Sequence, residues 1–572
     1  MKKTFKRLGA MLLAMAMAVS VLCTGALAAD TTYTLTINDT NSKHTYVAYQ
    51  VFTGDLATVD DNKVLSNIQW GEGVNQENQV DNKTLVQAIQ AITVGENANK
   101  PFEGKNTAAE IAEVLGSTAN NQKDSDVAKE FAAVVANYVT GDGHTSGNWA
   151  DAVKNGDTVT TPAHYDISGL TAGYYFVKSN NDASATDVAN TRYILSVVGD
   201  STVETKAAVP TVDKKVKNST DTTDKETTTA QIGEKVTFTL TGTLPDNYDQ
   251  YKTYKYVFHD KLSNGLTLDK SSIKVYKNSV ADGNLISNDA SNTYYTVKPT
   301  EDTTLTDSCT FEVEFTNLKN VTSTKIDTII VQYTATLNKD AVVEGNDNKV
   351  NLEYSNDPNK EGTGTTAEKE VKVYTFQMNV VKTNGKDGNE LKKLPNAKFV
   401  LGTKDDLDLG TIDNNGTPTT TAGLIPVVAG TAPLYTVNDN LTADETKTYV
   451  MSTDDSGALN IMGLKPGKYY LYETKAPDGY NKLTKSIKIE IEVTTDGTLT
   501  ILPTLETIVG DSSTKITTTN GTIETVTVVN NAGSTLPSTG GMGTTLFYIF
   551  GGVLMAGAAI VLVIKKKRSS AE

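Results

Sequence analysis

The sequence predicts an all-β, multi-domain protein, and three observations support that prediction. The chain has 572 residues, which is too long for one hydrophobic core and suits about three or four domains. Tyrosine (25 residues) far outnumbers tryptophan (2), and Thr and Val recur in short alternating runs, a composition typical of strands. Hydrophobic residues make up 38% of the chain and charged residues 21%, which fits folded domains rather than a disordered polymer.

The first 28 residues have the pattern of a secretory signal. Basic residues in Lys2–Arg7 precede an apolar run, Met11–Leu22, and the small residues of Ala26–Ala28 mark a cleavage site. The run is short for a permanent membrane anchor. The sequence therefore predicts export and removal of residues 1–28.

Residues 29–208 are predicted to form a β-domain with helical insertions. Apolar and polar residues alternate over Tyr33–Ile37, as in a strand. Farther on, Thr107 and Glu110 have the pattern of a capping box at the start of a helix. Helical spacing of apolar residues is clearest in Phe131, Val134, Val135 and Tyr138.

Residues 209–373 are predicted to form a second domain without helices. Turn-rich pairs such as Asn264-Gly265 and Asp282-Gly283 separate alternating runs of apolar residues. About ten short strands without a helix predict an immunoglobulin-like β-sandwich. The alternating runs include Val236–Leu240, Tyr254–Phe258 and Val350–Tyr354.

Residues 374–533 are predicted to form a third all-β domain, and an internal repeat links it to the first. Gly169–Phe176 reads GLTAGYYF, and Gly463–Tyr470 reads GLKPGKYY. Repetition of one fold explains this similarity most simply. The predicted architecture is therefore three tandem immunoglobulin-like sandwiches, the first with helical insertions.

Residues 534–572 have three parts in a fixed order. The pentapeptide Leu536-Pro537-Ser538-Thr539-Gly540 comes first. The apolar stretch Leu546–Ile564, long enough to cross a membrane as a helix, follows it and runs directly into the basic residues Lys565–Arg568. This order matches the LPXTG cell-wall sorting signal.

The sorting-signal resemblance implies a covalent attachment. A sortase cysteine attacks the carbonyl carbon of Thr539, releases the chain from Gly540 onward and passes the acyl group to an amine. The apolar segment then holds only the precursor in the membrane, and the mature protein is secreted and joined to the cell wall.

Two motifs in the third segment resemble a known family. Tyr469–Tyr480 reads YYLYETKAPDGY and closely resembles the E-box of collagen-adhesin (Cna) B-type domains and Gram-positive pilins. Leu394–Leu401 reads LPNAKFVL and resembles an early strand of that family. With the sorting signal, the chain is similar to LPXTG-anchored backbone (shaft) pilins. The resemblance implies intramolecular Lys–Asn isopeptide bonds promoted by a buried acid.

Strand phase selects candidates for such a bond in the third segment. Lys382 shares a strand face with Met378 and Val380, so it is expected to point inward. Glu473 and Asn530 share faces with apolar residues in the same way. Burial lowers the pKa of a lysine and raises that of an acid, and a neutral amine is a nucleophile. The alternative is a lysine at a strand edge that extends into solvent, with Glu473 in an ordinary ion pair.

The same test gives Lys214, Asp260 and Asn348 in the second segment, in the order lysine, acid, asparagine that is found in shaft pilins. Each alternates with apolar neighbours along its run. Lys215 and Asn351 are the alternatives in the opposite phase. In the first segment Ser179 aligns with Glu473 and the opening strand has no lysine, so no such bond is expected there.

A shaft pilin must also offer an amine to Thr539 of the next subunit. In relatives this lysine lies near the end of the first domain, often in a YPK-like motif that is absent here in its usual form. Lys206, just before Pro210, occupies the comparable place and is the candidate polymerisation lysine. The alternative is a solvated linker lysine.

The function expected from the resemblance is therefore that of a structural pilus subunit. Its partners would be pilin-specific and housekeeping sortases, other copies of the chain, minor pilins and peptidoglycan. The alternative is a monomeric wall-anchored adhesin or accessory pilin that binds a host surface ligand. Each isopeptide site would react once, so the chain is not expected to be an enzyme.

Other function classes find little support in the sequence. The formal charge of −16 gives no basic patch for nucleic acid. No cofactor motif appears, and no metal site is expected because the four histidines are scattered without zinc spacing. The acidic run Asp405–Asp408 is more simply a solvated loop than a calcium site.

Overall fold

The computed structural model describes most of the chain between residues 31 and 569. The described ranges are 31–39, 44–59, 62–95, 98–117, 120, 125–144, 147–155, 158–179, 186, 188–205, 208–289, 292–300, 305, 307–321, 326–358, 361–384, 392–438, 446–493, 503–509, 512–517, 525–534 and 543–569. The predicted signal peptide, Lys206 and the pentapeptide 536–540 lie outside the described residues.

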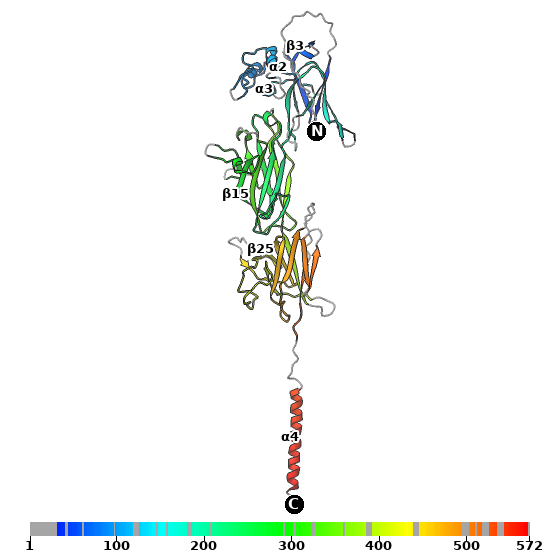
Figure 1. Ribbon diagram of the computed structural model, residues 1–572, viewed down its shortest axis with the longest axis vertical. Helices are drawn as coiled ribbons and strands as arrows, with labels where there is room; N and C mark the ends of the chain where they lie inside the picture. Colours follow the sequence, from blue (N-terminus) through cyan, green and yellow to red (C-terminus); the bar gives the residue numbers. More distant parts are fainter. Residues whose placement is uncertain are drawn as a thin grey trace, which may run out of the picture. The chain divides into compact units, whose positions relative to one another are not determined.

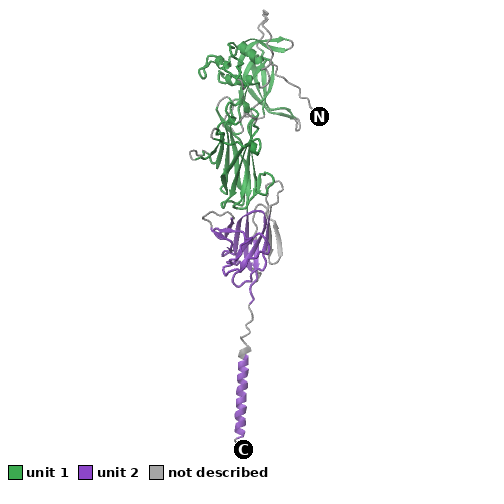
Figure 2. Cartoon of the chain, turned by 60° about the vertical axis from the view of Figure 1, so that its left-hand side comes forward, with its two compact units in different colours: residues 1–375 green, residues 376–572 purple. Residues whose placement is uncertain are grey.

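The chain divides into two compact units, Met1–Thr375 and Phe376–Glu572 (Figure 2). The division between them falls two residues after the predicted boundary between the second and third domains. The separation of residues 29–208 from residues 209–373 stays a prediction, because both segments lie in the first unit.

The first segment contains two four-stranded sheets, with strand orders β10-β1-β7-β4 and β3-β2-β8-β9, and a short hairpin of β5 and β6. The strands are β1 (Tyr33–Asn38), β2 (Tyr46–Val59), β3 (Asn62–Trp70), β4 (Gly147–Ala150), β5 (Val153–Asn155), β6 (Thr158–Thr161), β7 (His164–Leu170), β8 (Gly173–Ser179), β9 (Arg192–Val197) and β10 (Ser201–Glu204).

Three helices follow β3, namely α1 (Leu85–Gln90), α2 (Ala108–Gly116) and α3 (Asp126–Val135) (Figure 1). The predicted capping box is present, since the Thr107 side chain accepts a hydrogen bond from the backbone N–H of Glu110 at the start of α2. The first half of strand β2, Tyr46–Phe52, is buried on both faces: Tyr46 and Ala48 pack between the two sheets, whereas Val47 packs with the helices. The prediction of helical insertions in a β-domain is therefore confirmed.

The second segment is a sandwich of two sheets around one core. One sheet has the order β11-β13-β18-β15, and the other has the order β12-β21-β19-β14-β17-β16, with β20 paired to β19. The strands are β11 (Val212–Lys217), β12 (Thr227–Thr229), β13 (Lys235–Thr243), β14 (Tyr256–Leu262), β15 (Leu266–Lys277), β16 (Thr296–Lys298), β17 (Phe311–Phe315), β18 (Thr328–Leu337), β19 (Asn346–Ser355), β20 (Thr363–Thr365) and β21 (Lys369–Tyr374). Short 3-10 turns are η1 (Tyr248–Gln250), η2 (Asp282–Asn284) and η3 (Leu318–Asn320).

The alternation of buried and more exposed residues along the strands explains why this segment forms a sandwich. In β13 the residues Val236, Phe238 and Leu240 are buried while the intervening residues are at least partly exposed. Facing residues of β14 and β19, such as Phe258 and Leu352, enter the same hydrophobic core. A period of two with one buried face is the pattern of a sandwich strand.

The second unit also contains two large sheets, with orders β26-β24-β25-β28-β22-β33 and β27-β23-β29-β30-β31-β32. The strands are β22 (Phe376–Asn384), β23 (Lys398–Gly402), β24 (Val427–Ala429), β25 (Leu434–Val437), β26 (Lys447–Thr448), β27 (Met451–Ser452), β28 (Ala458–Leu464), β29 (Gly467–Lys475), β30 (Ile487–Val493), β31 (Pro503–Val509), β32 (Ser512–Thr517) and β33 (Thr525–Asn530). The first and last strands, β22 and β33, are parallel neighbours. The predicted all-β architecture is confirmed.

The last element is α4 (Gly543–Arg568). An 18-residue stretch within Leu546–Arg568 has a mean hydropathy of 2.5, and by length and composition this part of the helix could cross a membrane. The basic residues Lys565–Arg568 form its last turn.

Candidate functional site

The first candidate site lies inside the second segment and joins its two sheets. Lys214 comes from β11 in one sheet, and its side chain is fully buried. Asp260 on β14 and Asn348 on β19 come from the facing sheet, where the two strands are hydrogen-bonded neighbours. The alternation of each strand turns these three polar residues into the apolar core.

Within this site the lysine contacts both partners. Lys214 Nζ donates to Asp260 Oδ2 at 2.5 Å and to Asn348 Oδ1 at 2.6 Å. A third bond runs to the backbone oxygen of Lys349 at 3.2 Å. The amine therefore lies beside the carboxamide that it would have to attack.

Tyr333 on β18 completes the cluster, and sequence reasoning missed it. Its hydroxyl donates to Asp260 Oδ1 at 2.9 Å and accepts from Asn348 Nδ2 at 2.7 Å. The phenol thus holds the acid and the amide nitrogen in one hydrogen-bonded chain. Its position in the alternating run of β18 indicates burial, but a buried tyrosine is common in such cores and indicates no chemistry.

Burial sets the protonation states in this site. Desolvation lowers the pKa of Lys214 to about 8, although Asp260 opposes the shift. Desolvation also raises the pKa of Asp260, against the opposing effect of Lys214. Both shifts favour the neutral forms, a free amine and a protonated acid.

The second candidate site lies in the second unit and has a different set of contacts. Glu473 on β29 accepts two hydrogen bonds from Asn530 Nδ2 on β33, at 2.8 and 3.0 Å, and one from the backbone N–H of Leu483 at 2.7 Å. Lys382 is fully buried on β22, and its Nζ donates to the backbone oxygens of Val528 at 3.1 Å and Thr383 at 3.3 Å.

Lys382 and Asn530 lie on adjacent parallel strands, because Lys382 pairs with Val528 in the register of β22 and β33. Asn530 Oδ1 is buried and has no hydrogen-bond partner among the described residues. Desolvation lowers the pKa of Lys382 to about 8 and raises that of Glu473. In this site, as in the first, burial favours a neutral amine and a protonated acid.

The alternative residues lie in ordinary surroundings. Lys215 is a partly exposed lysine that pairs with Glu226 at 3.1 Å and Asp213 at 3.7 Å. Asn351 is only partly buried. In the first segment, Ser179 Oγ donates to Asn190 Oδ1 at 3.1 Å and accepts from the N–H of Thr191 at 2.6 Å, so a small hydroxyl fills the place of an acid.

Chemically, each site brings an amine near a carboxamide with an acid at hand, in a dry core. A neutral amine can attack the carboxamide carbon, and fixed proximity lowers the barrier to such a step. A protonated acid can donate a hydrogen bond to the developing charge and a proton to the leaving nitrogen. The arrangement is suited to a single amide-exchange reaction at each site.

Two family models match parts of the chain. Residues 378–504 match the SpaA prealbumin-like fold domain, and residues 528–570 match the LPXTG cell wall anchor motif. The second match, with the apolar helix α4 that follows the motif, shows a protein that is attached to the cell wall after a transient hold in the membrane.

One curated relative and two solved structures are similar to the chain. The trypsin-resistant surface T6 protein of Streptococcus pyogenes serotype M6 is 25% identical over 407 residues, which is 64% of this chain and 70% of that protein. The T6 backbone pilin structure of the same serotype is 17% identical with a TM-score of 0.47, covering 89% of this chain and 100% of that one. The full-length major pilin SpaD from Corynebacterium diphtheriae is 17% identical with a TM-score of 0.44, covering 89% and 99%. The two family matches and the T6 relative confirm the resemblance to LPXTG-anchored pilins.

Proposed function

We propose that this chain is the repeating structural subunit of a sortase-assembled pilus on a Gram-positive cell surface. The observation that carries the proposal is the buried contact of Lys214 with Asp260 and Asn348, in a chain that ends in a cell-wall anchor. An unreacted charged cluster would be costly to bury in a β-sandwich core. A covalent bond removes that cost and suits a load-bearing fibre.

In the proposed bond-forming step, the neutral Lys214 Nζ attacks Cγ of Asn348. The new C–N bond forms as the bond from Cγ to Nδ2 breaks, and ammonia leaves after one proton passes from the lysine nitrogen to the leaving nitrogen. Asp260 relays that proton, since it lies 2.5 Å from Lys214 Nζ and is linked through Tyr333 to Asn348 Nδ2. Lys382, Glu473 and Asn530 act in the corresponding roles in the second unit.

Assembly follows from the sorting signal. A pilin-specific sortase cleaves after Thr539 and transfers its acyl group to Lys206 of the next subunit, and a housekeeping sortase joins the last subunit to peptidoglycan. Minor pilins are further partners. The isopeptide sites each react once, so the chain is a substrate of sortase and not an enzyme.

Cell-wall extracts test the polymer directly. We expect a ladder of high-mass species that is lost in Thr539→Ala and Lys206→Ala chains and kept in Lys214→Ala. Lys154→Ala is the matched control, because Lys154 is an exposed lysine of the same predicted domain. A ladder that persists without Lys206 would overturn the acceptor assignment. A single wall-attached species in the unaltered chain would instead favour the monomeric adhesin.

Intact mass tests the internal bonds. The chain from Ala29 to Thr539 should lack two ammonia masses, and Asp260→Asn or Glu473→Gln should each restore one. Asp347→Asn is the matched control, because this carboxylate neighbours Asn348 but its side chain is 39% exposed. A full mass in the unaltered chain would remove the isopeptide proposal.

A further inference from the structure

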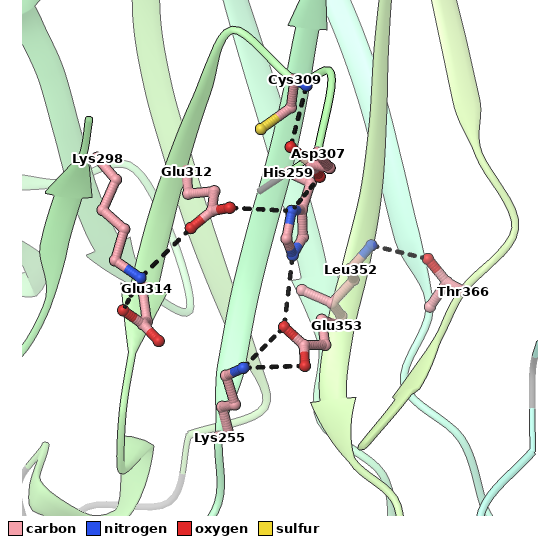
Figure 3. Close-up of polar contacts among 10 residues, drawn as sticks. All are labelled: Lys255, His259, Lys298, Asp307, Cys309, Glu312, Glu314, Leu352, Glu353 and Thr366. Atoms are coloured by element: carbon pink, nitrogen blue, oxygen red, sulfur yellow. Dashed lines mark hydrogen bonds and ion pairs between the residues drawn. The ribbon is translucent and has the colours of Figure 1, made fainter. Parts of the chain in front are cut away.

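Four side chains of metal-ligating types meet on the second segment, on the face of β14 opposite Asp260. His259 lies within β14 and pairs directly with Glu312 on the neighbouring strand β17, so both side chains project from one face. Asp307 and Cys309 come from the segment that leads into β17. The potential ligand atoms of the four residues all lie within 4.8 Å of one another (Figure 3).

We propose that His259, Asp307, Cys309 and Glu312 bind a divalent transition-metal ion of the zinc type. One imidazole, one thiolate and two carboxylates supply four ligands, the number that a closed tetrahedral zinc site takes. Calcium and magnesium prefer oxygen ligands alone, so the thiol and the imidazole disfavour them. Binding requires the Cys309 thiol to lose its proton to solvent as the sulfur–metal bond forms.

The spacing of the ligand atoms allows such a site with small adjustments. Zinc–ligand bonds of about 2.0–2.3 Å place tetrahedral ligand atoms about 3.3–3.8 Å apart. His259 Nδ1 already lies 2.8 Å from Asp307 Oδ2 and 3.5 Å from Glu312 Oε1. Rotation of exposed Asp307 and half-buried Cys309 can supply the remaining movement of about 1 Å.

The surroundings of His259 match those of a metal-bound histidine. Its Nδ1 faces the other three residues, and its Nε2 lies 3.5 Å from Glu353 Oε2 on the opposite side of the ring. Lys255 holds Glu353 with two hydrogen bonds of 2.9 Å. A ligating histidine usually passes its other N–H to a carboxylate in this way, which orients the ring.

Glu312 supplies an independent observation. Its side chain is 8% exposed, and its two ion pairs, to His259 at 3.5 Å and Lys298 at 3.6 Å, are long. Both are longer than the contact that joins Lys298 to Glu314, which is 2.6 Å. A nearly buried carboxylate with only long ion pairs is incompletely compensated, and a metal ion would supply a closer partner.

The site is also placed to affect the proposed cross-link. The backbone N–H of Thr310 donates to the backbone oxygen of Asp260 at 2.6 Å, beside Cys309. A metal held between β14 and the segment before β17 would therefore brace the strand that carries the acid. The competing explanation is that a protonated His259 forms ion pairs with the surrounding carboxylates, in which case the cluster would bind no metal.

Cobalt(II), a spectroscopic substitute for zinc, is the first probe. We expect the full mature chain to bind one Co2+ with a thiolate-to-metal charge-transfer band, and one equivalent of Zn2+ to abolish that band. Cys309→Ser and His259→Gln should lose the band, and Glu353→Gln should weaken binding about tenfold or more. His164→Gln is the matched control, because His164 also faces a carboxylate, that of Asp166, at 3.8 Å. The His164→Gln chain should bind Co2+ as the unaltered chain does.

A second measurement needs no variant and so does not depend on how a variant folds. Saturating Zn2+ should slow modification of Cys309 by a thiol-specific disulfide reagent at least tenfold. An unchanged modification rate, absence of the charge-transfer band, or a band that survives in Cys309→Ser would each overturn the site.

Discussion

Each of the two buried lysine clusters contains a lysine, an acid and an asparagine, but the two clusters connect them differently. In the second segment Lys214 bonds directly to both Asp260 and Asn348, and Tyr333 links the acid to the amide. In the second unit the acid bonds to the asparagine, while Lys382 bonds only to backbone oxygens among the described residues. The hydrogen-bond pattern is therefore not what the sites share.

Burial is what they share. In both clusters desolvation is the largest cause of a lowered lysine pKa, to about 8, and of a raised acid pKa. The space between the two sheets of a sandwich excludes water, so any ionisable side chain that points inward is desolvated, whichever strand carries it. Burial in the sandwich thus sets the protonation states of the lysine and the acid, whereas local hydrogen-bond partners align the amine, the acid and the carboxamide.

The largest expected effect is the loss of either bond. Lys214 and Asn348 are 134 residue steps apart, and Lys382 and Asn530 are 148 apart. By analogy with disulfides, loops of this size give about 5 kcal/mol each to the free energy of unfolding. Asn348→Ala and Asn530→Ala should therefore lower it by similar amounts in their own units, measured by denaturant unfolding alongside intact mass.

Asn351→Ala is the control for this pair, since Asn351 lies on β19 in the opposite phase and is only partly buried. It should keep both ammonia deficits. A large loss of stability with no change in mass would contradict the covalent explanation and leave only lost packing.

The next effect separates the two sites. Tyr333→Phe removes the hydroxyl that joins Asp260 to Asn348, while no such hydroxyl is bonded to Glu473 or Asn530 among the described residues. Loss of one hydrogen bond to the reacting groups costs about 1–3 kcal/mol, or about fivefold to 150-fold in rate. Ammonia release during refolding should slow by that factor in the second segment and stay unchanged in the second unit. Equal slowing of both would refute a specific role for Tyr333.

The pH dependence should be alike in the two sites. The amine must be neutral, and the fraction of neutral amine rises with pH up to the lysine pKa of about 8. The acid must be protonated, and the fraction of protonated acid falls once the pH passes the raised acid pKa, so the rate follows the product of the two fractions. We expect a bell-shaped rate of bond formation for each site, followed by intact mass of refolding samples. A rate that rises continuously with pH would exclude the protonated acid.

The smallest effect concerns the outer face of the second segment, which carries the proposed metal site. Hydrogen bonds from His259 and Lys255 lower the pKa of Glu353 to about 2 from its ordinary value of 4.5. Its ionised form therefore stabilises the fold above pH 4.5, and that contribution is lost as the pH falls toward 2. In metal-free chains, Glu353→Gln should cost about 1 kcal/mol at neutral pH and progressively less in acid. A difference that stays constant with pH would contradict this origin.

Much of the architecture could be predicted because strand alternation is a local property. Met378, Val380 and Lys382 alternate in sequence, and the same alternation puts them in the core. The helix start at Thr107 could be predicted because a capping box involves neighbouring residues only.

Long-range contacts could not be predicted in this way. The parallel pairing of β22 with β33 sets Lys382 opposite Val528, and nothing in either strand alone specifies that register. Tyr333 was missed because a tyrosine in a core strand has many ordinary explanations. The His259 cluster was missed because 48 residues separate His259 from Asp307, so the spacing of histidines along the chain does not reveal it.

The pairing of the first strand of the second unit with its last has a consequence for extensibility. Under a pull applied to its two ends, this unit without a bond could unravel, and the 148 residue steps from Lys382 to Asn530 hold about 500 Å of contour length. A bond between those two residues would leave that length slack, because the load would pass from β22 to β33 without entering the loop. A fibre of such units would keep nearly its resting length up to the force that breaks covalent bonds.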